Sequence, residues 1–232
     1  MIKVRPNKDR GSAHHGWLET KHSFSFAHYY DPQYMGFRSL RVINEDIIAG
    51  GGGFPTHHHE NMEIITYVIS GALEHKDSMG TGSVIKAGDV QYMSAGTGVQ
   101  HSEYNASETM PVHLLQIWLL PNEFGVEPRY NQRSISKQAK QNKLCLLASG
   151  GVDHSALRIR QEVRLYASCL ESGKSLEYSI EPNRAIWLQN ITGQLRLNNT
   201  EIEPGDGVSV EGATKIRITS VETAEFLLFD LI

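Results

Sequence analysis

The feature that most constrains the fold is a repeated pattern of short strands and glycine turns. Residues 68–73 (VISGAL) resemble residues 190–195 (NITGQL), and residues 85–90 (IKAGDV) resemble residues 202–207 (IEPGDG). Each copy reads as a strand, a glycine turn, a second strand and then a Gly-Asp turn, at similar spacing in the two halves. The repeat predicts two copies of one β unit.

The rest of the chain follows the same rhythm. Apolar runs rich in Val, Ile, Leu, Tyr and Trp are interrupted by turn residues roughly every ten residues, which is typical of an antiparallel sandwich or barrel. The polar stretch 134–143 is the best helix candidate, or else a linker. We therefore predict an all-β protein with little helix, divided into an N-terminal domain over residues 1–133 and a C-terminal domain over residues 134–232.

Composition excludes some functions. The formal net charge is −4 and the basic residues are scattered, so we expect no direct nucleic-acid binding, which normally requires a basic face. Arg158, Arg160 and Arg164 form the densest basic stretch and are predicted to be the solvated face of one strand.

The two cysteines and the apolar segments bear on location. Cys145 and Cys169 lie in separate apolar runs without metal-ligand spacing, which favours buried free thiols in a reducing compartment. No stretch is long and apolar enough to span a membrane, and the first residues do not resemble a secretory signal. We predict a cytoplasmic protein that does not bind membranes.

Two pairs of residues carry the candidate chemistry. Side chains two apart in a strand point to the same face, so His57 and His59 share one face, and His101 and Glu103 share another. Two such strands side by side inside a barrel would bring three imidazoles and one carboxylate together. Nitrogen and oxygen ligands without thiolate suit a catalytic divalent metal, above all iron(II).

Neighbouring residues are ranked by the same alternation. His58 points away from the His57 face and is predicted to be a neighbour, not a ligand. Glu63 falls on the ligand face if the strand continues, so it is the second choice for the carboxylate. Glu60 is predicted to be a solvated turn residue.

Other candidate residues receive a structural interpretation. The aromatic cluster is predicted to lie in an N-terminal strand and to pack the barrel core, with walls of a pocket as the alternative; it comprises Phe24, Phe26, Tyr29 and Tyr30. Gln116 is predicted to be an ordinary strand side chain, with a place in the site as the alternative. The isolated histidines are predicted to be surface or satisfied core residues: His14, His15, His22, His28, His75 and His154.

At this point the motifs resemble those of a known family. The pattern Gly51-x5-His57-x-His59-x3-Glu63-x7-Gly71 resembles the first motif of the cupins, and residues 88–105, with a longer spacing before His101, resemble the second. The departures are similar to one branch of cupins, the pirins. Further segments support that branch: HGWL at 15–18, HSFSFAHYYDP at 22–32, MGF at 35–37, LRVIN at 40–44, MSAGTG at 93–98 and HSEYN at 101–105.

The resemblance implies a bicupin, two jelly-roll β-barrels packed face to face with metal only in the N-terminal one. The ligands carry over as His57, His59, His101 and Glu103, whereas Glu63, a ligand in many other cupins, is not one in pirins. The copies also differ in this sequence, because the second half has no matching histidines.

The resemblance implies two alternative functions. Some pirins are quercetin 2,3-dioxygenases, which cleave flavonols with dioxygen, and we predict this activity with Glu103 as general base. Others are iron-dependent, redox-sensitive cofactors of transcription that act through a protein partner. The sequence does not select iron over manganese, nickel, cobalt, copper or zinc, and a monomer is expected.

Overall fold

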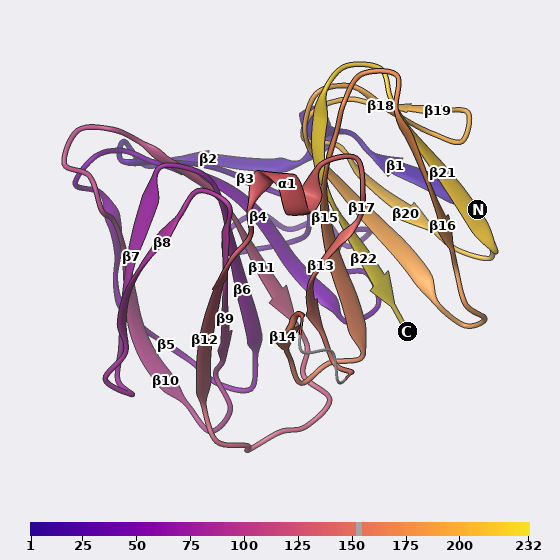
Figure 1. Ribbon diagram of the computed structural model, residues 1–232. Helices are drawn as coiled ribbons and strands as arrows, with labels where there is room; N and C mark the ends of the chain where they lie inside the picture. The colour runs from indigo at the N-terminus through magenta and orange to yellow at the C-terminus, as the bar shows by residue number, and fades with distance from the viewer. Residues whose placement is uncertain (152–154) are drawn as a thin grey trace. The chain divides into compact units, whose positions relative to one another are not determined.

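The computed structural model describes residues 1–151 and 155–232, so His154 lies outside the described residues. The chain forms two compact units (Figure 1). The N-terminal unit comprises residues 11–134 and 159–161, and the C-terminal unit comprises residues 1–10, 135–158 and 162–232. Residues 1–10 therefore group with the second half of the chain, although their sequence position suggested the first.

The N-terminal unit consists of two antiparallel sheets. One has seven strands in the order β12-β9-β6-β11-β4-β3-β2, and the other has four in the order β5-β10-β7-β8. The bounds are β2 Gly11–His14, β3 Leu18–His22, β4 Leu40–Ile48, β5 Gly53–His59, β6 Glu63–Ser70, β7 Ala72–Asp77, β8 Gly82–Lys86, β9 Asp89–Ser94, β10 Val99–Asn105, β11 Val112–Leu119 and β12 Arg129–Ser134.

The C-terminal unit repeats this plan. Its seven-stranded sheet has the order β1-β20-β17-β22-β15-β13-β14, and its four-stranded sheet has the order β16-β21-β18-β19. The bounds are β1 Ile2–Arg5, β13 Cys145–Ser149, β14 Leu157–Arg158, β15 Val163–Leu170, β16 Ser175–Ser179, β17 Ala185–Thr192, β18 Leu195–Leu197, β19 Thr200–Ile202, β20 Gly207–Val210, β21 Lys215–Ser220 and β22 Ala224–Leu231. Strand β1 lies beside β20, far from it in sequence (Figure 1).

The internal repeat is visible in the topology. The order β9-β6-β11-β4 in one unit matches β20-β17-β22-β15 in the other, and β5-β10-β7-β8 matches β16-β21-β18-β19. The first repeated glycines, Gly71 and Gly193, both have positive φ, 79° and 69°. A Cβ there would lie 2.8 Å from the Pro111 carbonyl oxygen and 2.3 Å from that of Thr223, so both turns require glycine. The all-β fold with two repeated domains is confirmed.

The repeated Gly-Asp turns are also held alike. The Asp89 carboxylate accepts a hydrogen bond from the Lys86 amide at 2.9 Å, and the Asp206 carboxylate accepts one from the Glu203 amide at 3.0 Å. Each aspartate thereby closes the turn that leads into the next strand. The two halves therefore share local chemistry as well as strand order.

The interiors of the two units differ. The C-terminal unit has a continuous apolar core that includes Leu195, Leu197, Ile216 and Ile218, all at most 1% exposed. The N-terminal unit has two smaller apolar clusters, one around Ile48 and Leu114 and one around Ile64 and Met93. Its buried residues also include His75, His101 and Glu103. Burying such groups costs free energy unless they are paired, so their position marks a candidate site.

A short segment from the second half of the chain completes the N-terminal unit. The backbone N–H of Arg160 donates to the Glu63 carboxylate at 3.0 Å, and its guanidinium donates to Ser94 Oγ at 3.2 Å. The prediction of one basic strand face was therefore wrong: Arg158 ends β14, Arg160 follows it, and Arg164 belongs to β15, where it pairs with Glu181 at 2.8 Å.

Other local expectations are settled by the elements themselves. The polar stretch after residue 134 contains one short helix, α1 Lys137–Lys140, with Ser136 as its N-cap. The aromatic cluster does not form a strand: residues 23–38 are turns with isolated bridges, because Phe26 and Phe37 pair only with nearby residues. Both cysteines are free thiols, and they are partly exposed.

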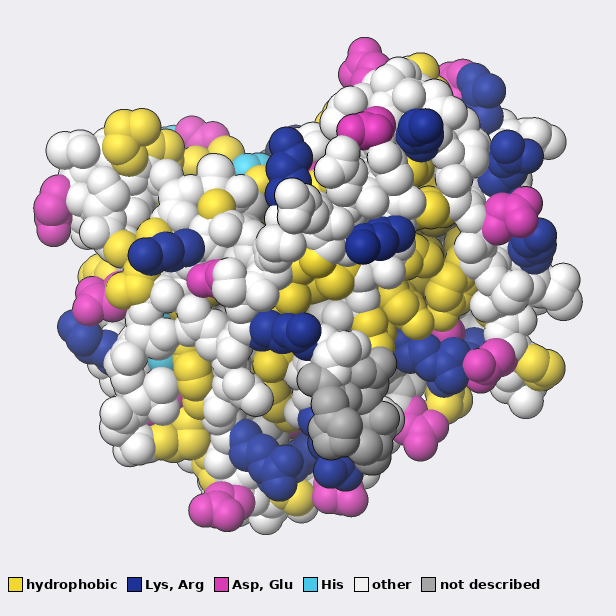
Figure 2. Space-filling model, viewed as in Figure 1, with side chains coloured by type: hydrophobic (Ala, Val, Ile, Leu, Met, Phe, Trp, Pro, Cys, Tyr) yellow, Lys and Arg dark blue, Asp and Glu magenta, His cyan; other side chains and the backbone are white. Residues whose placement is uncertain are grey.

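The charged side chains on the surface and the length of the helices bear on nucleic-acid and membrane binding. On the face in Figure 2, Lys and Arg are interspersed with acidic and uncharged side chains. Within the described part of the chain, no helix has the length and apolar character needed to cross a membrane.

Candidate metal centre

Strands β5 and β10 place the predicted ligands side by side. They pair antiparallel, with Val99 opposite His59 and His101 opposite His57. The register then shifts, so Glu103 lies opposite Phe54. This irregularity is a β-bulge, which re-aims side chains and is common beside functional sites.

The three histidines converge. The centroid of the His57 ring lies 4.8 Å from that of His59 and 4.4 Å from that of His101, and the last two are 5.0 Å apart. One ring nitrogen from each lies within 4.8 Å of the others. This is the spacing expected of imidazoles that surround one ion.

Glu103 is associated with this group through His101. Their ligand atoms, with one from His75, form a second group whose members also lie within 4.8 Å of one another. The two groups share His101. The described residues therefore contain an imidazole and carboxylate cluster in which Glu103 lies nearer to the His75 side than to His57 and His59.

Burial keeps the imidazoles neutral. It lowers the pKa of His59 to about 4, with repulsion from His57 and His58 as smaller causes. It lowers the pKa of His101 to about 2, assisted by repulsion from His57, His59 and His75. A neutral imidazole keeps a lone pair, which is the form that binds a metal.

Burial has the opposite effect on the carboxyl group. It raises the pKa of Glu103 to about 7, and the charge of Asp46 adds to the shift. The hydrogen bond from Gln116 opposes it. A carboxyl group with a pKa near neutrality exchanges protons readily at physiological pH.

The buried donor atoms fit a divalent metal. His101 Nε2 and Glu103 Oε1 are fully buried and have no hydrogen-bond partner among the described residues. Buried polar atoms nearly always have a hydrogen-bond partner. Two buried acceptor atoms without one, in the same cluster, therefore indicate that a cation binds between them. Nitrogen and oxygen donors without sulfur suit iron(II), manganese, cobalt, nickel, copper or zinc.

Neighbouring groups orient two of these side chains. Thr66 Oγ1 donates to Gln116 Oε1 at 3.0 Å, and Gln116 Nε2 donates to Glu103 Oε2 at 2.9 Å, which leaves Oε1 unpaired. Gln116 is thus part of the site, contrary to its predicted role as an ordinary strand residue. His57 Nδ1 lies 2.8 Å from the Pro55 carbonyl oxygen, to which it donates, so that Nε2 keeps its lone pair.

Among the described residues of the C-terminal unit, there is no counterpart of this cluster. Because Leu73 pairs with Asn105 and its repeat equivalent Leu195 pairs with Ser220, the positions of His101 and Glu103 correspond to Ile216 and Ile218. By the same register, Tyr178 stands where His57 stands in β5. Apolar and aromatic side chains thus replace the donors, as the sequence comparison of the halves indicated.

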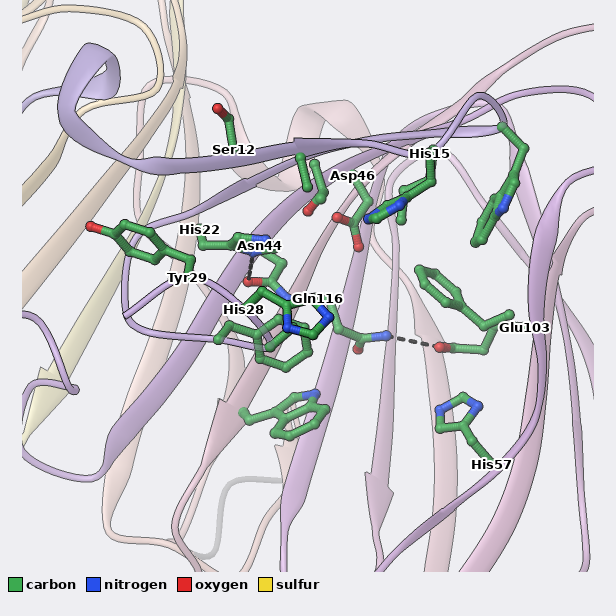
Figure 3. A pocket seen from close by; sticks show the side chains of 18 of the residues that line it. Ser12, His15, His22, His28, Tyr29, Asn44, Asp46, His57, Glu103 and Gln116 are labelled. Atoms are coloured by element: carbon green, nitrogen blue, oxygen red, sulfur yellow. Dashed lines mark hydrogen bonds between the residues drawn. The ribbon is translucent and has the colours of Figure 1, made fainter. Parts of the chain in front are cut away.

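The cluster opens into a cavity of about 710 Å³ within the N-terminal unit. Figure 3 shows His57 and Glu103 at one end, His22 and Tyr29 toward the other, and Gln116 between them, reaching toward Glu103. His59 also lines the cavity. Aromatic rings form much of the wall: Trp17, Phe26, Phe54, Tyr29 and Trp118. A mainly apolar cavity of this size with a few convergent polar groups is typical of a small-molecule site.

Other predicted residues lie outside the cluster. His58 is exposed and faces Glu60, 4.0 Å away, as the alternation predicted. Glu63 is 1% exposed, but Tyr92 Oη and Ser94 Oγ donate to it, the latter at 2.7 Å, so its oxygens are already engaged. Glu63 is therefore not placed as a ligand.

The aromatic cluster divides between the two interpretations given for it. Phe26 and Tyr29 line the cavity, which was the alternative, whereas Phe24 is in the core and Tyr30 is 71% exposed. The sequence interpretation did not identify His15, His22 and His28 as cavity residues. His75 and Asp77 are fully buried beside His101. Their spacing, two apart on a strand, is the same signal that identified the other pairs.

Fold and site together define a class: a two-barrel β protein with a histidine and carboxylate cluster in one barrel. Comparison with known proteins narrows it. Residues 3–119 match the family model Pirin, and residues 146–231 match the model for the quercetinase C-terminal cupin domain. The chain belongs to the pirin family.

Individual relatives agree along the whole chain. A quercetin 2,3-dioxygenase of Escherichia coli K12 is 45% identical over 231 residues, covering 100% of this chain and 99% of the relative. A pirin-like protein of Caulobacter vibrioides is 41% identical, covering 99% of both. The crystal structure of the bacterial pirin YhhW from Escherichia coli in complex with nickel(II) superposes with a TM-score of 0.95 at 43% identity, covering 100% and 99%.

Proposed function

We propose that this chain is a metal-dependent flavonol 2,3-dioxygenase of the quercetin-cleaving kind. The observation that carries the proposal is the position of His57, His59 and Glu103 in the wall of a 710 Å³ aromatic-walled cavity, with His101 shared by the two groups of ligand atoms to which these residues belong. Relatives from two Escherichia coli strains named quercetin 2,3-dioxygenase, at 45% identity, support an oxidoreductase of this kind.

The cavity suits a flat polyphenol. Trp17 and Phe54 pack edge to face with centroids 5.1 Å apart, and Phe26 and Trp118 do so at 5.3 Å, which gives two aromatic pairs in the wall.

In the proposed reaction, Glu103 is the general base. His57, His59, His101 and Glu103 would hold a divalent metal such as iron(II), which when bound would supply the Lewis acidity that lowers the pKa of the flavonol 3-hydroxyl. Glu103 Oε1, which has no hydrogen-bond partner among the described residues, accepts the hydroxyl proton. Gln116 Nε2 donates to the other oxygen, Oε2, and so holds the carboxylate in place. Ring opening by dioxygen releases carbon monoxide.

The test is quercetin consumption in air, followed by loss of its visible absorbance. Protein stripped of metal is reloaded separately with iron(II), manganese, nickel, cobalt, copper or zinc, and His101→Ala provides the blank. We expect multiple turnovers with at least one metal. No turnover above the blank with any metal, despite full occupancy, would overturn the proposal in favour of the iron-dependent regulatory alternative that acts through a protein partner.

A second variant tests the base. Glu103→Gln keeps the shape of the side chain but removes the proton acceptor, so turnover should fall at least about 100-fold. Glu45→Gln is the matched control, because Glu45 is a partly buried carboxylate of the same unit that does not line the large cavity. Intact turnover in Glu103→Gln would assign the proton transfer to another group.

A further inference from the structure

Strand β7 brings a third pair of side chains to the cluster. It pairs antiparallel with β10, with Asp77 opposite His101 and His75 opposite Glu103. All four side chains face the interior, and those of His75 and Asp77 are fully buried. His75 thus lies between a candidate metal ligand and a buried carboxylate.

The distances join these groups in a row. Asp77 Oδ2 lies 3.0 Å from His75 Nε2, and His75 Nδ1 lies 3.4 Å from His101 Nδ1, a long hydrogen bond. The other oxygen of Asp77 accepts from the amides of Met79 and Thr81, at 2.9 and 3.0 Å, which fixes the carboxylate in its turn. The first group in the series Asp77, His75 and His101 is therefore fixed in position.

The chemistry of the donors sets the tautomers along the row. An ionised carboxylate only accepts, so His75 carries its proton on Nε2. Neutral His75 then has an acceptor at Nδ1, so the hydrogen bond between the two Nδ1 atoms has His101 as its donor. A proton on Nδ1 leaves the lone pair of His101 on Nε2, the nitrogen without a partner among the described residues.

Packing holds the His75 ring in place. Tyr130 stacks on it with centroids 4.8 Å apart and planes 29° apart, and Gln91 Nε2 lies 3.2 Å from Nδ1, to which it donates. A second donor at Nδ1 is compatible only with the Nε2-protonated form of neutral His75.

The fold itself does not require these groups. The repeat places Leu195 at the position of Leu73, so the position of His75 corresponds to Leu197 in β18, which is fully buried in the apolar core. A leucine there satisfies the barrel without any polar partner. An imidazole and a carboxylate buried at this point of the N-terminal unit therefore indicate a role toward the site.

We propose that Asp77 and His75 are positioning residues that hold the His101 ring with Nδ1 protonated and Nε2 presented to the metal. The proposal rests on the metal site of the proposed function but not on its substrate. Metal-binding histidines commonly donate their second N–H to a carboxylate or carbonyl, and here a histidine backed by a carboxylate takes that place.

The first measurement reads the tautomer directly, in the metal-free wild-type protein. Long-range proton–nitrogen NMR correlations distinguish Nδ1–H from Nε2–H imidazoles. We expect His101 as the Nδ1–H form and His75 as the Nε2–H form. An Nε2–H form of His101 would overturn the proposal, whether or not the protein cleaves flavonols.

The second measurement uses variants and the affinity for nickel(II) alone. Asp77→Asn keeps the turn through Oδ1 but offers an N–H to His75, so the tautomers of both rings should reverse and the affinity should fall about 10- to 100-fold. His75→Phe keeps the ring but removes the acceptor, with the same expected loss. His75→Gln can still accept from His101 through its amide oxygen, and we expect it to retain more of the affinity.

A histidine–carboxylate pair elsewhere in the unit supplies the controls. Glu45 Oε1 and His113 Nε2 are also 3.0 Å apart, outside the large cavity, so Glu45→Gln and His113→Phe match the two test variants. The metal-free melting temperature of each variant separates folding from affinity. Unchanged nickel(II) affinity in folded Asp77→Asn and His75→Phe would overturn the proposal. If the two variants bind nickel(II) more weakly but the wild type does not turn over quercetin, the positioning role of Asp77 and His75 is supported and only the proposed dioxygenase activity is overturned.

Discussion

At the residue scale, the burial of Glu103 opposes the ionised state that its proposed role requires. Glu103 is buried at 2% exposure, which favours the neutral acid, yet the proposed ligand and base must be ionised. The metal resolves the conflict when bound, because a cation stabilises the charged form. In the metal-free protein, the buried Glu103 carboxylate should therefore lower the free energy of unfolding.

The pH dependence of unfolding measures this effect. Because folding raises the pKa of Glu103 from 4.5 to about 7, the folded metal-free state holds a proton that the unfolded chain releases between these values. The free energy of unfolding should fall as pH rises from 4.5 to 7, by about 3 kcal/mol from this group, and then level off. Urea titrations of wild type and Glu103→Gln across this range should differ by that slope; equal slopes would contradict it. Glu60→Gln, at an exposed position, is the control.

At the level of elements, Glu63 shows how one carboxylate can belong to the fold and not to the site. It begins β6 and accepts hydrogen bonds from Tyr92, Ser94 and the backbone of Arg160, which arrives from the second half of the chain. Its proximity in sequence to His59 made it the second-choice ligand, but its oxygens are engaged in attaching residues 159–161 to the N-terminal unit.

Replacing Glu63 should therefore affect stability and spare chemistry. Glu63→Gln leaves at least one of the three donors facing an amide N–H, and we expect a loss of about 2–3 kcal/mol in the free energy of unfolding. Nickel(II) affinity and quercetin turnover of the folded variant should remain near wild type. The reverse result, lost nickel(II) binding with unchanged stability, would place Glu63 in the metal site.

The strand alternation in the sequence was sufficient to propose the ligands and to separate His57 and His59 from His58. It did not identify His75 and Asp77, although they have the same spacing, because their role depends on β7 lying next to β10. Pairing between strands distant in sequence is set by topology and register, which alternation alone does not contain. The same reason explains Arg160, and the turn-rich segment around Phe26 and Tyr29 had no periodicity from which its place in the cavity wall could be predicted.

At the level of the whole molecule, one plan is used twice with different interiors. The positions of His57, His101 and Glu103 in the N-terminal unit are occupied by Tyr178, Ile216 and Ile218 in the other. In the second unit the side chains at these positions are apolar or aromatic, and their burial stabilises the unit without a ligand. The two units should therefore respond differently to metal.

Hydrogen exchange with and without nickel(II) tests this difference. Metal that binds only the folded site stabilises it, so amide protection should rise in β5, β7 and β10. The matching strands β16, β18 and β21 should show no change, and His101→Ala should abolish the effect. A comparable rise in β16 and β21 would contradict the assignment of metal to one unit.

The return of residues 159–161 to the N-terminal unit has a consequence for synthesis on the ribosome. Glu63 and Ser94 leave the exit tunnel long before Arg160, so the N-terminal unit stays incomplete while β13 and β14 of the other unit are being made. Strand β1 likewise waits for β20. Neither unit can finish folding as an uninterrupted stretch of nascent chain, so a fragment that ends at residue 134 should be a chaperone substrate and not an independent domain.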